Sequence, residues 1–190
     1  MNVSTKADEF FSEKRKPILL LLVSESKYFL SHRLSLALAA KEAGYEVLVA
    51  TSNPGELASV RNMFQVVSIP FERSIGGVFE ELRVLAKIKE CINQNEPAIV
   101  HAVSLKISIL AALCMRSAKS SVLLCAFTGL GYIFTSNKIA AKVLKFVVTL
   151  LLRTLLSNRR YWGVVQNKED LEFLQKIKGG CSNRLLLIRG

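Results

Sequence analysis

Side chains suited to metal binding or redox chemistry are scarce in this chain. Only two histidines and four cysteines occur among its 190 residues. Cys91, Cys114, Cys125 and Cys181 lie far apart and form no CxxC pair, so their spacing indicates neither a zinc site nor a disulfide framework. Three of the four occur in apolar stretches, which predicts core thiols of a reducing cytosol. We therefore expect no metal site.

Targeting and membrane-spanning segments are also missing. The first residues, MNVSTKADEFFSEKRKP, are polar and contain acids, unlike a signal peptide, and we expect residues 1–15 to form a polar tail. The longest apolar stretches, such as PILLLLV and FVVTLLL, are far shorter than the ~20 residues that cross a bilayer. The sequence thus predicts no transmembrane helix and leaves a peripheral membrane contact open.

Acidic residues are few relative to basic ones. The chain has 26 Lys and Arg against 15 Asp and Glu, a formal charge of +11. From Lys138 onward, basic residues outnumber acidic ones by 11 to 3. Such a surface suits nucleic acid, anionic lipid or a phosphorylated substrate, or has no partner at all. Nucleic acid fits least, because aromatic residues do not interleave with the basic ones as a stacking platform requires.

Apolar runs alternate with helical patterns along the rest of the chain. The expected strands are Pro17–Ser24, Tyr45–Thr51, Gln65–Ile69, Pro97–Val103, Ser121–Phe127, Tyr161–Gln166 and Arg184–Ile188. The expected helices are Ser31–Ala43, Pro54–Phe64, Gly77–Gln94, Ser104–Ser117, Lys138–Ser157 and Asn167–Lys176. This alternation predicts one α/β domain over residues 16–190, a Rossmann-like doubly wound parallel sheet with the strand order 3-2-1-4-5-6.

Two of these helices carry further signals. Gly44 is a natural C-terminal cap for the first helix. The helix Gly77–Gln94 is expected to be amphipathic, with its apolar residues near one side: Phe79, Leu82, Leu85, Ala86 and Ile88.

The predicted strand order points to a binding site. The first and fourth strands are neighbours where the winding reverses, and ligands of such sheets bind beyond the carboxyl ends of the strands. The loops Ser24–Ser31, His101–Ser104 and Phe127–Asn137 follow those ends and hold or adjoin both histidines. We expect His32 in the first turn of the first helix and His101 at the carboxyl end of the fourth strand, with Lys106 opening the next helix.

His101 is the candidate catalytic residue. A neutral imidazole at this position can act as a base or hydrogen-bond a hydroxyl near neutral pH. The alternative for either histidine is a structural role with its hydrogen bonds satisfied.

The TGLGY segment brings two glycines, Gly129 and Gly131, directly after the fifth strand. Glycine allows a positive φ and a close approach of the backbone to a ligand, although a tight structural turn needs the same residues. The segment is not GxGxxG and follows the wrong strand for a nicotinamide cofactor. A P-loop and a GxSxG motif are absent as well.

Basic and hydroxyl side chains recur along the helix that follows. They are spaced so that they share one face of it, namely Lys138, Lys142, Lys145, Thr149, Arg153 and Ser157. The rest of the helix is apolar. This pattern describes either a core helix with a solvated edge or an in-plane contact with anionic lipid headgroups, to which Arg159 and Arg160 would add.

Five segments in the same order resemble a known family. FLSHRLSLALAAKEAGYEVLVAT, RSIGGVFEELRVL, PAIVHAVSLK, FTGLGYIFTS and LLLIRG are similar to the amino-terminal lobe of family 4 glycosyltransferases of the GT-B fold. The likeness covers roughly Pro17 to Gly190 and is greatest to enzymes that extend bacterial lipid-linked or lipopolysaccharide sugars. Ser35 stands where the family often has Pro, and Ala98 where it often has Asp.

The resemblance implies transfer of a sugar from a nucleotide-sugar to an acceptor held in a cleft between two lobes. This lobe would shape the acceptor side, with His101 as its catalytic residue. The implied substrate-binding residues are Lys27, Tyr28, His32, Arg33, Lys106, Thr128, Gly129, Gly131 and Tyr132. Basic side chains and helix N-termini would steady the leaving diphosphate, which agrees with the lack of a DxD motif.

In the family, a second lobe follows the IRG segment and binds the nucleotide-sugar, whereas here nothing follows Gly190. The resemblance therefore implies that this lobe binds no cofactor itself and is inactive alone. We expect a cytoplasmic domain in cell-envelope lipopolysaccharide or polysaccharide synthesis that meets the inner face of the membrane through Lys138, Lys142, Lys145 and Arg153. The alternatives are a membrane-associated scaffold for a separate donor-binding chain, or another Rossmann-like enzyme that uses a nucleotide cofactor.

Overall fold

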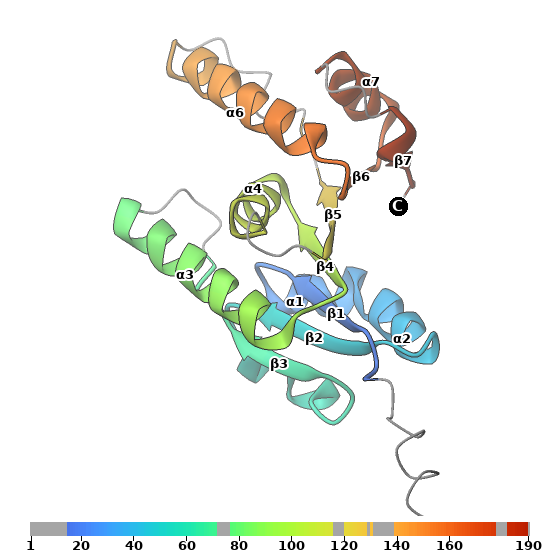
Figure 1. Ribbon diagram of the computed structural model, residues 1–190. Coiled ribbons are helices and arrows are strands. Elements are labelled where there is room, and N and C mark those ends of the chain that lie inside the picture. Colours follow the sequence, from blue (N-terminus) through green and yellow to red (C-terminus); the bar gives the residue numbers. More distant parts are fainter. Residues whose placement is uncertain are drawn as a thin grey trace, which may run out of the picture.

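The protein is a parallel sheet covered by helices on both faces (Figure 1). A computed structural model describes residues 15–71, 77–115, 120–128, 130, 139–177 and 182–189, with only the backbone for residues 139–144 and 182. The strands are β1 (Ile18–Leu22), β2 (Glu46–Thr51), β3 (Gln65–Ser68), β4 (Ile99–Val103), β5 (Val122–Phe127), β6 (Tyr161–Val165) and β7 (Leu185–Leu187). The helices are α1 (Ser26–His32), α2 (Leu34–Glu42), α3 (Val78–Asn95), α4 (Leu105–Cys114), α6 (Ile139–Ser157) and α7 (Lys168–Lys176), with short 3-10 turns η2 (Pro54–Val60) and η3 (Ser182–Arg184).

The strand order confirms the prediction. It runs β3-β2-β1-β4-β5-β6-β7, so the expected order holds and the seventh strand extends it beyond β6. β1 pairs in parallel with β2 and with β4, which brings Leu20 opposite both Leu48 and Val100. Leu20, Leu21 and Leu22 are fully buried. A strand of consecutive apolar residues is covered on both faces, as a central strand of a parallel sheet requires.

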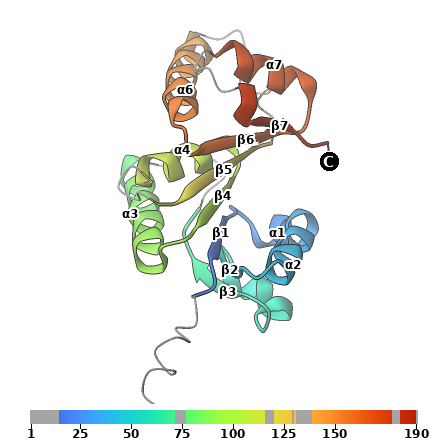
Figure 2. The ribbon, with the colours of Figure 1, turned by 45° about the vertical axis from the view of Figure 1, so that its right-hand side comes forward.

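Two hydrophobic clusters separate the faces of the sheet. Figure 1 shows α1 and α2 on one side and α3, α4 and α6 on the other, and Figure 2 shows the same division from another angle. On the α1 and α2 side, Phe29 and Ala37 pack against Leu21 and Val49. On the other side, buried residues of α3, α4, α6 and α7 join Leu20, Cys125 and Phe127 in the larger cluster.

The predicted loop Ser24–Ser31 is wrong, because most of it is helix α1. The chain forms two helices in place of the one expected from Ser31, and Arg33 separates them with φ −127° and ψ −10°. Tertiary packing decides this difference. Phe29 is fully buried and meets Phe64 edge to face at 5.9 Å, so the segment is anchored as a helix on the sheet. The Gly44 cap is confirmed, with φ +92° just after α2.

Two other helical segments differ from expectation. Residues 54–64 were expected to be helical, and the structure has a 3-10 helix there that is shorter and ends at Val60. In α3 the predicted apolar side is partly wrong. Phe79 and Leu82 are 87% and 54% exposed, and the buried side consists of Val84, Ile88, Cys91 and Ile92.

Three cysteines are buried, as the apolar stretches around them predicted. They are Cys91, Cys114 and Cys125, while Cys181 lies outside the described residues. Burial raises the pKa of Cys91 and of Cys114 to about 11 and the pKa of Cys125 to about 12. These thiols remain protonated at neutral pH and are poor nucleophiles.

Gly163→Ala tests the close packing of β6 between β5 and β7. A Cβ at this position would lie 2.7 Å from Leu185 Cδ2 and 3.1 Å from Phe127 Cε2. Since Leu185 can partly move, we expect a loss of about 1 kcal/mol in the free energy of unfolding, measured by urea denaturation. Gly55→Ala is the matched control, because nothing lies within 4 Å of its added Cβ. Equal stability of the two variants would contradict the packing.

Candidate functional site

Three predicted site residues cluster where α1 ends and α2 begins. The rings of Tyr28 and His32 stack with centroids 4.5 Å apart and planes at 8°. The Arg33 guanidinium carbon lies 5.7 Å from the Tyr28 ring centre, and Arg33 Nη1 donates a hydrogen bond of 3.0 Å to the His32 carbonyl. His32 is thus the last residue of α1, not part of a first turn, and its Nδ1 is hydrogen-bonded to Ser31 Oγ at 2.6 Å.

His101 lies within electrostatic reach of Arg33 in this cluster. It is the middle residue of β4, so the prediction that it begins the loop after the strand is wrong. Side chains alternate along a strand, and its neighbours Ile99 and Val103 belong to the core on the α1 and α2 side, so His101 faces that side too. Only 3% of the residue is exposed.

The imidazole of His101 is neutral at physiological pH. Burial, and to a smaller extent the positive charge of nearby Arg33, lowers its pKa from 6.5 to about 4. Efficient proton abstraction needs a pKa near the working pH. The environment of His101 therefore favours hydrogen bonding by a neutral ring over general-base chemistry.

Buried polar atoms without partners mark this place. Both ring nitrogens of His101 lack a hydrogen-bond partner within the described residues, and so does the Nε of Arg33. An unsatisfied buried donor or acceptor costs about 1–3 kcal/mol. A hydroxyl or phosphate oxygen bound between them would recover part of that cost, so the Arg33–His101 pair is suited to a polar ligand.

The other predicted residues are distributed more widely. Lys27 is exposed on α1, and Thr128 directly follows β5. Lys106 on α4 forms an ion pair of 2.5 Å with Glu81 of α3. Both helices cover the face of the sheet opposite to the one that His101 faces. Gly129, Gly131 and Tyr132 lie outside the described residues.

The predicted membrane residues fall on or before α6. Lys145 and Arg153 are exposed there. Lys138 is outside the described residues, and for Lys142 only the backbone is described.

A buried carboxylate that the sequence pattern did not single out binds the backbone of Leu130. Asp170, in the first turn of α7, is 4% exposed. Its Oδ2 accepts hydrogen bonds from the Leu130 backbone N–H at 3.3 Å and from Asn167 Nδ2 at 3.0 Å, while Asn167 Oδ1 caps the helix by accepting from Asp170 N. The only signal in the sequence was Asn167 and Asp170 at N-cap spacing. Asp170 thereby positions the backbone between Gly129 and Gly131.

Polar contacts also join the loops after β1 and β2. Ser26 is fully buried, and its Oγ lies 3.2 Å from Thr51 Oγ1 and donates to the Asn53 carbonyl. After β4, Ser104 has φ +93°, a conformation that costs a non-glycine residue about 1–3 kcal/mol. The carboxyl edge of the sheet is therefore both tied together and locally strained.

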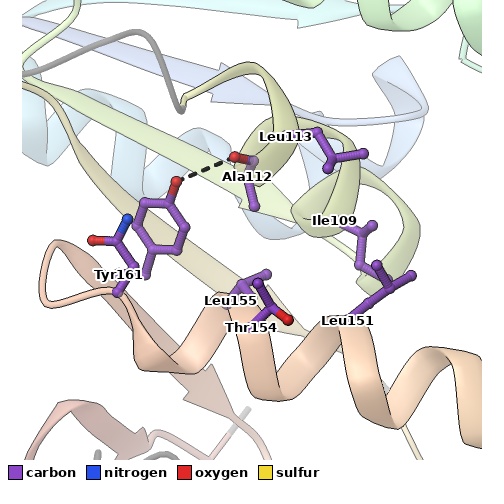
Figure 3. A pocket seen from close by; sticks show the side chains of 8 residues that line it. Ile109, Ala112, Leu113, Leu151, Thr154, Leu155 and Tyr161 are labelled. Atoms are coloured by element: carbon purple, nitrogen blue, oxygen red, sulfur yellow. Dashed lines mark hydrogen bonds between the residues drawn. The ribbon is translucent and has the colours of Figure 1, made fainter.

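A separate apolar groove lies between α4 and α6 (Figure 3). It encloses about 200 Å³ and is lined by Ile109, Ala112, Leu113, Leu151, Thr154, Leu155, Asn158 and Tyr161. The Tyr161 hydroxyl donates to the Ala112 carbonyl at 3.1 Å. Among the residues whose side chains are described, no predicted site residue and no charged residue lines the groove, so this lining is unsuited to a sugar phosphate.

Two further observations concern the described part of the chain. No cluster of three or more His, Cys, Asp or Glu side chains in it is placed to bind a metal ion. None of the helices within these ranges is both long and apolar enough to cross a bilayer.

The family follows from sequence comparison. The model of the glycosyl transferase 4-like family matches residues 18–158, which is well over half of the chain. The protein therefore belongs to the glycosyl transferase 4-like family. No curated protein sequence matches the chain.

Solved structures show the same fold. The chain is similar to a UDP-N-acetylglucosamine 2-epimerase (TM-score 0.63, 9% identity) and to sucrose-phosphate synthase from Thermosynechococcus elongatus (TM-score 0.61, 13% identity). It is also similar to HepE from Anabaena, solved in complex with UDP-glucose (TM-score 0.59, 16% identity). These matches cover 91%, 92% and 90% of this chain but 48%, 48% and 43% of the other chains. The fold is that of one Rossmann-like lobe of the GT-B type, and the chain spans under half the length of these proteins.

His101→Leu separates a structural histidine from one kept for a ligand. Leucine has a similar volume and removes the unsatisfied nitrogens, so we expect unchanged or higher stability at about pH 7 in urea denaturation. A loss of about 1 kcal/mol or more there would indicate that His101 makes structural hydrogen bonds.

The same variant has a signature in pH. Because folding lowers the pKa of His101, the unfolded chain binds the proton more tightly. Above about pH 6.5 this titration does not reduce the free energy of unfolding of the wild type. As the pH falls from there toward about 4, the free energy of unfolding decreases by about 3 kcal/mol in total. His101→Leu should lack that part of the decline.

Asp170→Ala tests the hydrogen bond that holds the Leu130 backbone. It leaves the Leu130 amide without its acceptor and should lower the free energy of unfolding by about 1–3 kcal/mol. Exchange of the Leu130 amide hydrogen should also accelerate, measured by NMR. Glu169→Ala, an exposed carboxylate in the same helical turn, is the control. Unchanged exchange at Leu130 in Asp170→Ala would contradict the role.

Proposed function

We propose that this domain is the acceptor-side lobe of a glycosyltransferase that moves a sugar from a nucleotide-sugar to a lipid-linked or polysaccharide acceptor. The family membership supports sugar transfer as the chemistry. The observation that carries the acceptor role is the Arg33–His101 pair, with buried and unpartnered polar atoms next to the β1–β4 switch point. The proposal extends to cell-envelope glycan synthesis on the cytoplasmic side of the membrane.

In this proposal Arg33 and His101 bind the acceptor. The Arg33 Nε–H donates to a phosphate or hydroxyl oxygen, and charge-assisted hydrogen bonds of this kind are among the stronger ones. The neutral ring of His101 accepts from, or donates to, a sugar hydroxyl. Tyr28 stacks with His32 and lies beside the guanidinium, so both help to keep Arg33 in place. Asp170 holds the backbone N–H of Leu130, just after β5.

The donor would be held elsewhere. HepE from Anabaena, a structure similar to this chain, was solved with UDP-glucose, and this supports a nucleotide-sugar as donor. We propose that a second, donor-binding lobe completes the enzyme and that the lobe described here does not transfer sugar alone. No cofactor of its own is required by this scheme.

The test is a transfer assay with the protein encoded by the full reading frame, radiolabelled nucleotide-sugars and a membrane lipid extract. Label should move into the lipid or polysaccharide fraction. Arg33→Ala should lower kcat/KM by about ten- to a hundredfold through loss of a charge-assisted hydrogen bond. Arg33→Lys should recover only part of it, because an ammonium lacks the planar fork of the guanidinium.

The control is Arg61→Ala, an exposed arginine just before β3 that lines a hollow with Lys41 and Tyr45. Equal turnover of Arg33→Ala and Arg61→Ala would remove Arg33 from the site. Failure of the wild type to transfer any sugar, together with capture of a separate donor-binding chain, would favour the scaffold alternative.

A further inference from the structure

Helix α6 exposes several large apolar side chains. Phe146 is 70% exposed, Leu150 54% and Val147 44%. The opposite side of the helix is well packed, with Val148, Leu152, Leu155 and Leu156 buried in the larger core. The exposed residues are therefore not a consequence of loose packing.

The exposed side of α6 forms one continuous strip. Phe146, Leu150 and Arg153 follow at spacings of four and three residues, which places them on the same face. Lys145 and Arg153 are exposed beside the apolar residues. Figure 2 shows α6 at the outer edge of the molecule, with α4 on its inner side. We name this strip, Lys145, Phe146, Val147, Leu150 and Arg153, the α6 surface.

The charged residues of helix α6 are all basic. Helix α6 contains no acidic residue, and the chain as a whole carries a formal charge of +11. An amphipathic helix with exposed large apolar residues and flanking cations is typical of helices that lie in the headgroup region of an anionic bilayer. The cations attract the headgroups and the apolar side chains enter the acyl boundary.

We infer that the α6 surface docks the protein in the plane of an anionic lipid bilayer, with Phe146 and Leu150 inserted and Lys145 and Arg153 at the headgroups. This inference rests on the proposed function only for its purpose, since a lipid-linked acceptor is presented at such a surface. It differs from a purely electrostatic contact, because apolar insertion adds binding that salt does not screen.

A second copy of the chain is a poorer occupant. Pairing two α6 surfaces about a twofold axis would bring the cations of one copy toward those of the other, with no acid on the helix to compensate. An anionic bilayer matches the apolar strip and the positive charge together.

The test is co-sedimentation of the purified chain with vesicles that contain about one third phosphatidylglycerol in phosphatidylcholine. We expect Phe146→Ser to weaken binding about tenfold at any salt concentration, since a large apolar side chain no longer enters the bilayer. Lys145→Gln and Arg153→Gln should each weaken binding about fivefold at low salt and little at about 0.5 M salt.

Phe79→Ser is the matched control. Phe79 is even more exposed than Phe146, but it lies in the first turn of α3 beside Glu80 and Glu81. We expect Phe79→Ser to bind as the wild type does. An equal loss in Phe79→Ser and Phe146→Ser would reveal non-specific adsorption of apolar side chains and overturn the inference, as would unchanged binding of Phe146→Ser.

Insertion can be observed directly. The chain has a single tryptophan, Trp162, so Phe146→Trp in a Trp162→Phe background reports from the α6 surface alone. Lipids brominated on their acyl chains should quench this fluorescence, and should leave that of Phe79→Trp in the same background unquenched. Vesicle binding without quenching of Phe146→Trp would contradict insertion.

Other partners of the α6 surface would give different experimental results. A dimer in light scattering that Phe146→Ser converts to a monomer would show self-association in place of lipid binding. Vesicle binding by the 190-residue chain but not by the protein of the full reading frame would show that additional chain covers α6. Either result overturns the inference.

Transfer to a detergent-solubilised acceptor keeps the two proposals apart. If that transfer occurs while vesicle binding is insensitive to α6, only the bilayer contact fails. If no transfer occurs, the proposed function fails whatever the vesicles show.

Discussion

The burial of β1 on both faces and along both edges is the constraint on which the rest of the structure depends. Leu20, Leu21 and Leu22 are fully buried, and the strand pairs with β2 on one side and β4 on the other. Each buried leucine contributes roughly 1.5–3 kcal/mol relative to exposure. With β1 in the centre, the chain winds outward first to β3 and then, after crossing back, to β7. The reversal places the switch point, where ligands of such sheets bind, at the carboxyl ends of β1 and β4.

The hydrophobic core on the α1 and α2 side also positions the polar side chains of Arg33 and His101. Phe29 and Ala37 pack α1 and α2 on the sheet, and the charge of Arg33 between the helices is near enough to act on His101 of β4. The resulting burial lowers the pKa of His101, and the Arg33 charge adds to that effect. A folded protein tolerates unsatisfied buried polar atoms at a cost in stability, and such costs concentrate at functional sites. This is the physical reason to regard the pair as a ligand-binding feature.

The helices on the other face illustrate a different limit. Helices α3 and α6 each carry more large apolar residues than their buried side can hold. Phe79 of α3 and Phe146 of α6 are therefore exposed. Their surroundings distinguish them, since Phe79 adjoins acids and Phe146 adjoins cations. Only the second combination matches an anionic lipid surface.

The sequence by itself determined the alternation of strands and helices, the central position of β1, the strand order up to β6 and the family. These depend on local periodicity and on the handedness of parallel crossovers, both of which are encoded in short segments. It also predicted the neighbourhood of Tyr28, His32, Arg33 and His101 through the switch-point rule.

Only the tertiary structure decided which side of each helix meets the sheet and which distant groups pair. Periodicity places Phe79 and Val84 on faces of a helix but does not say which face is covered. The ion pair of Lys106 with Glu81 and the hydrogen bond from Leu130 to Asp170, 40 residues apart in sequence, join elements that meet only after the sheet has formed. Burial and pairing are properties of the assembled layers, so no local pattern could reveal them.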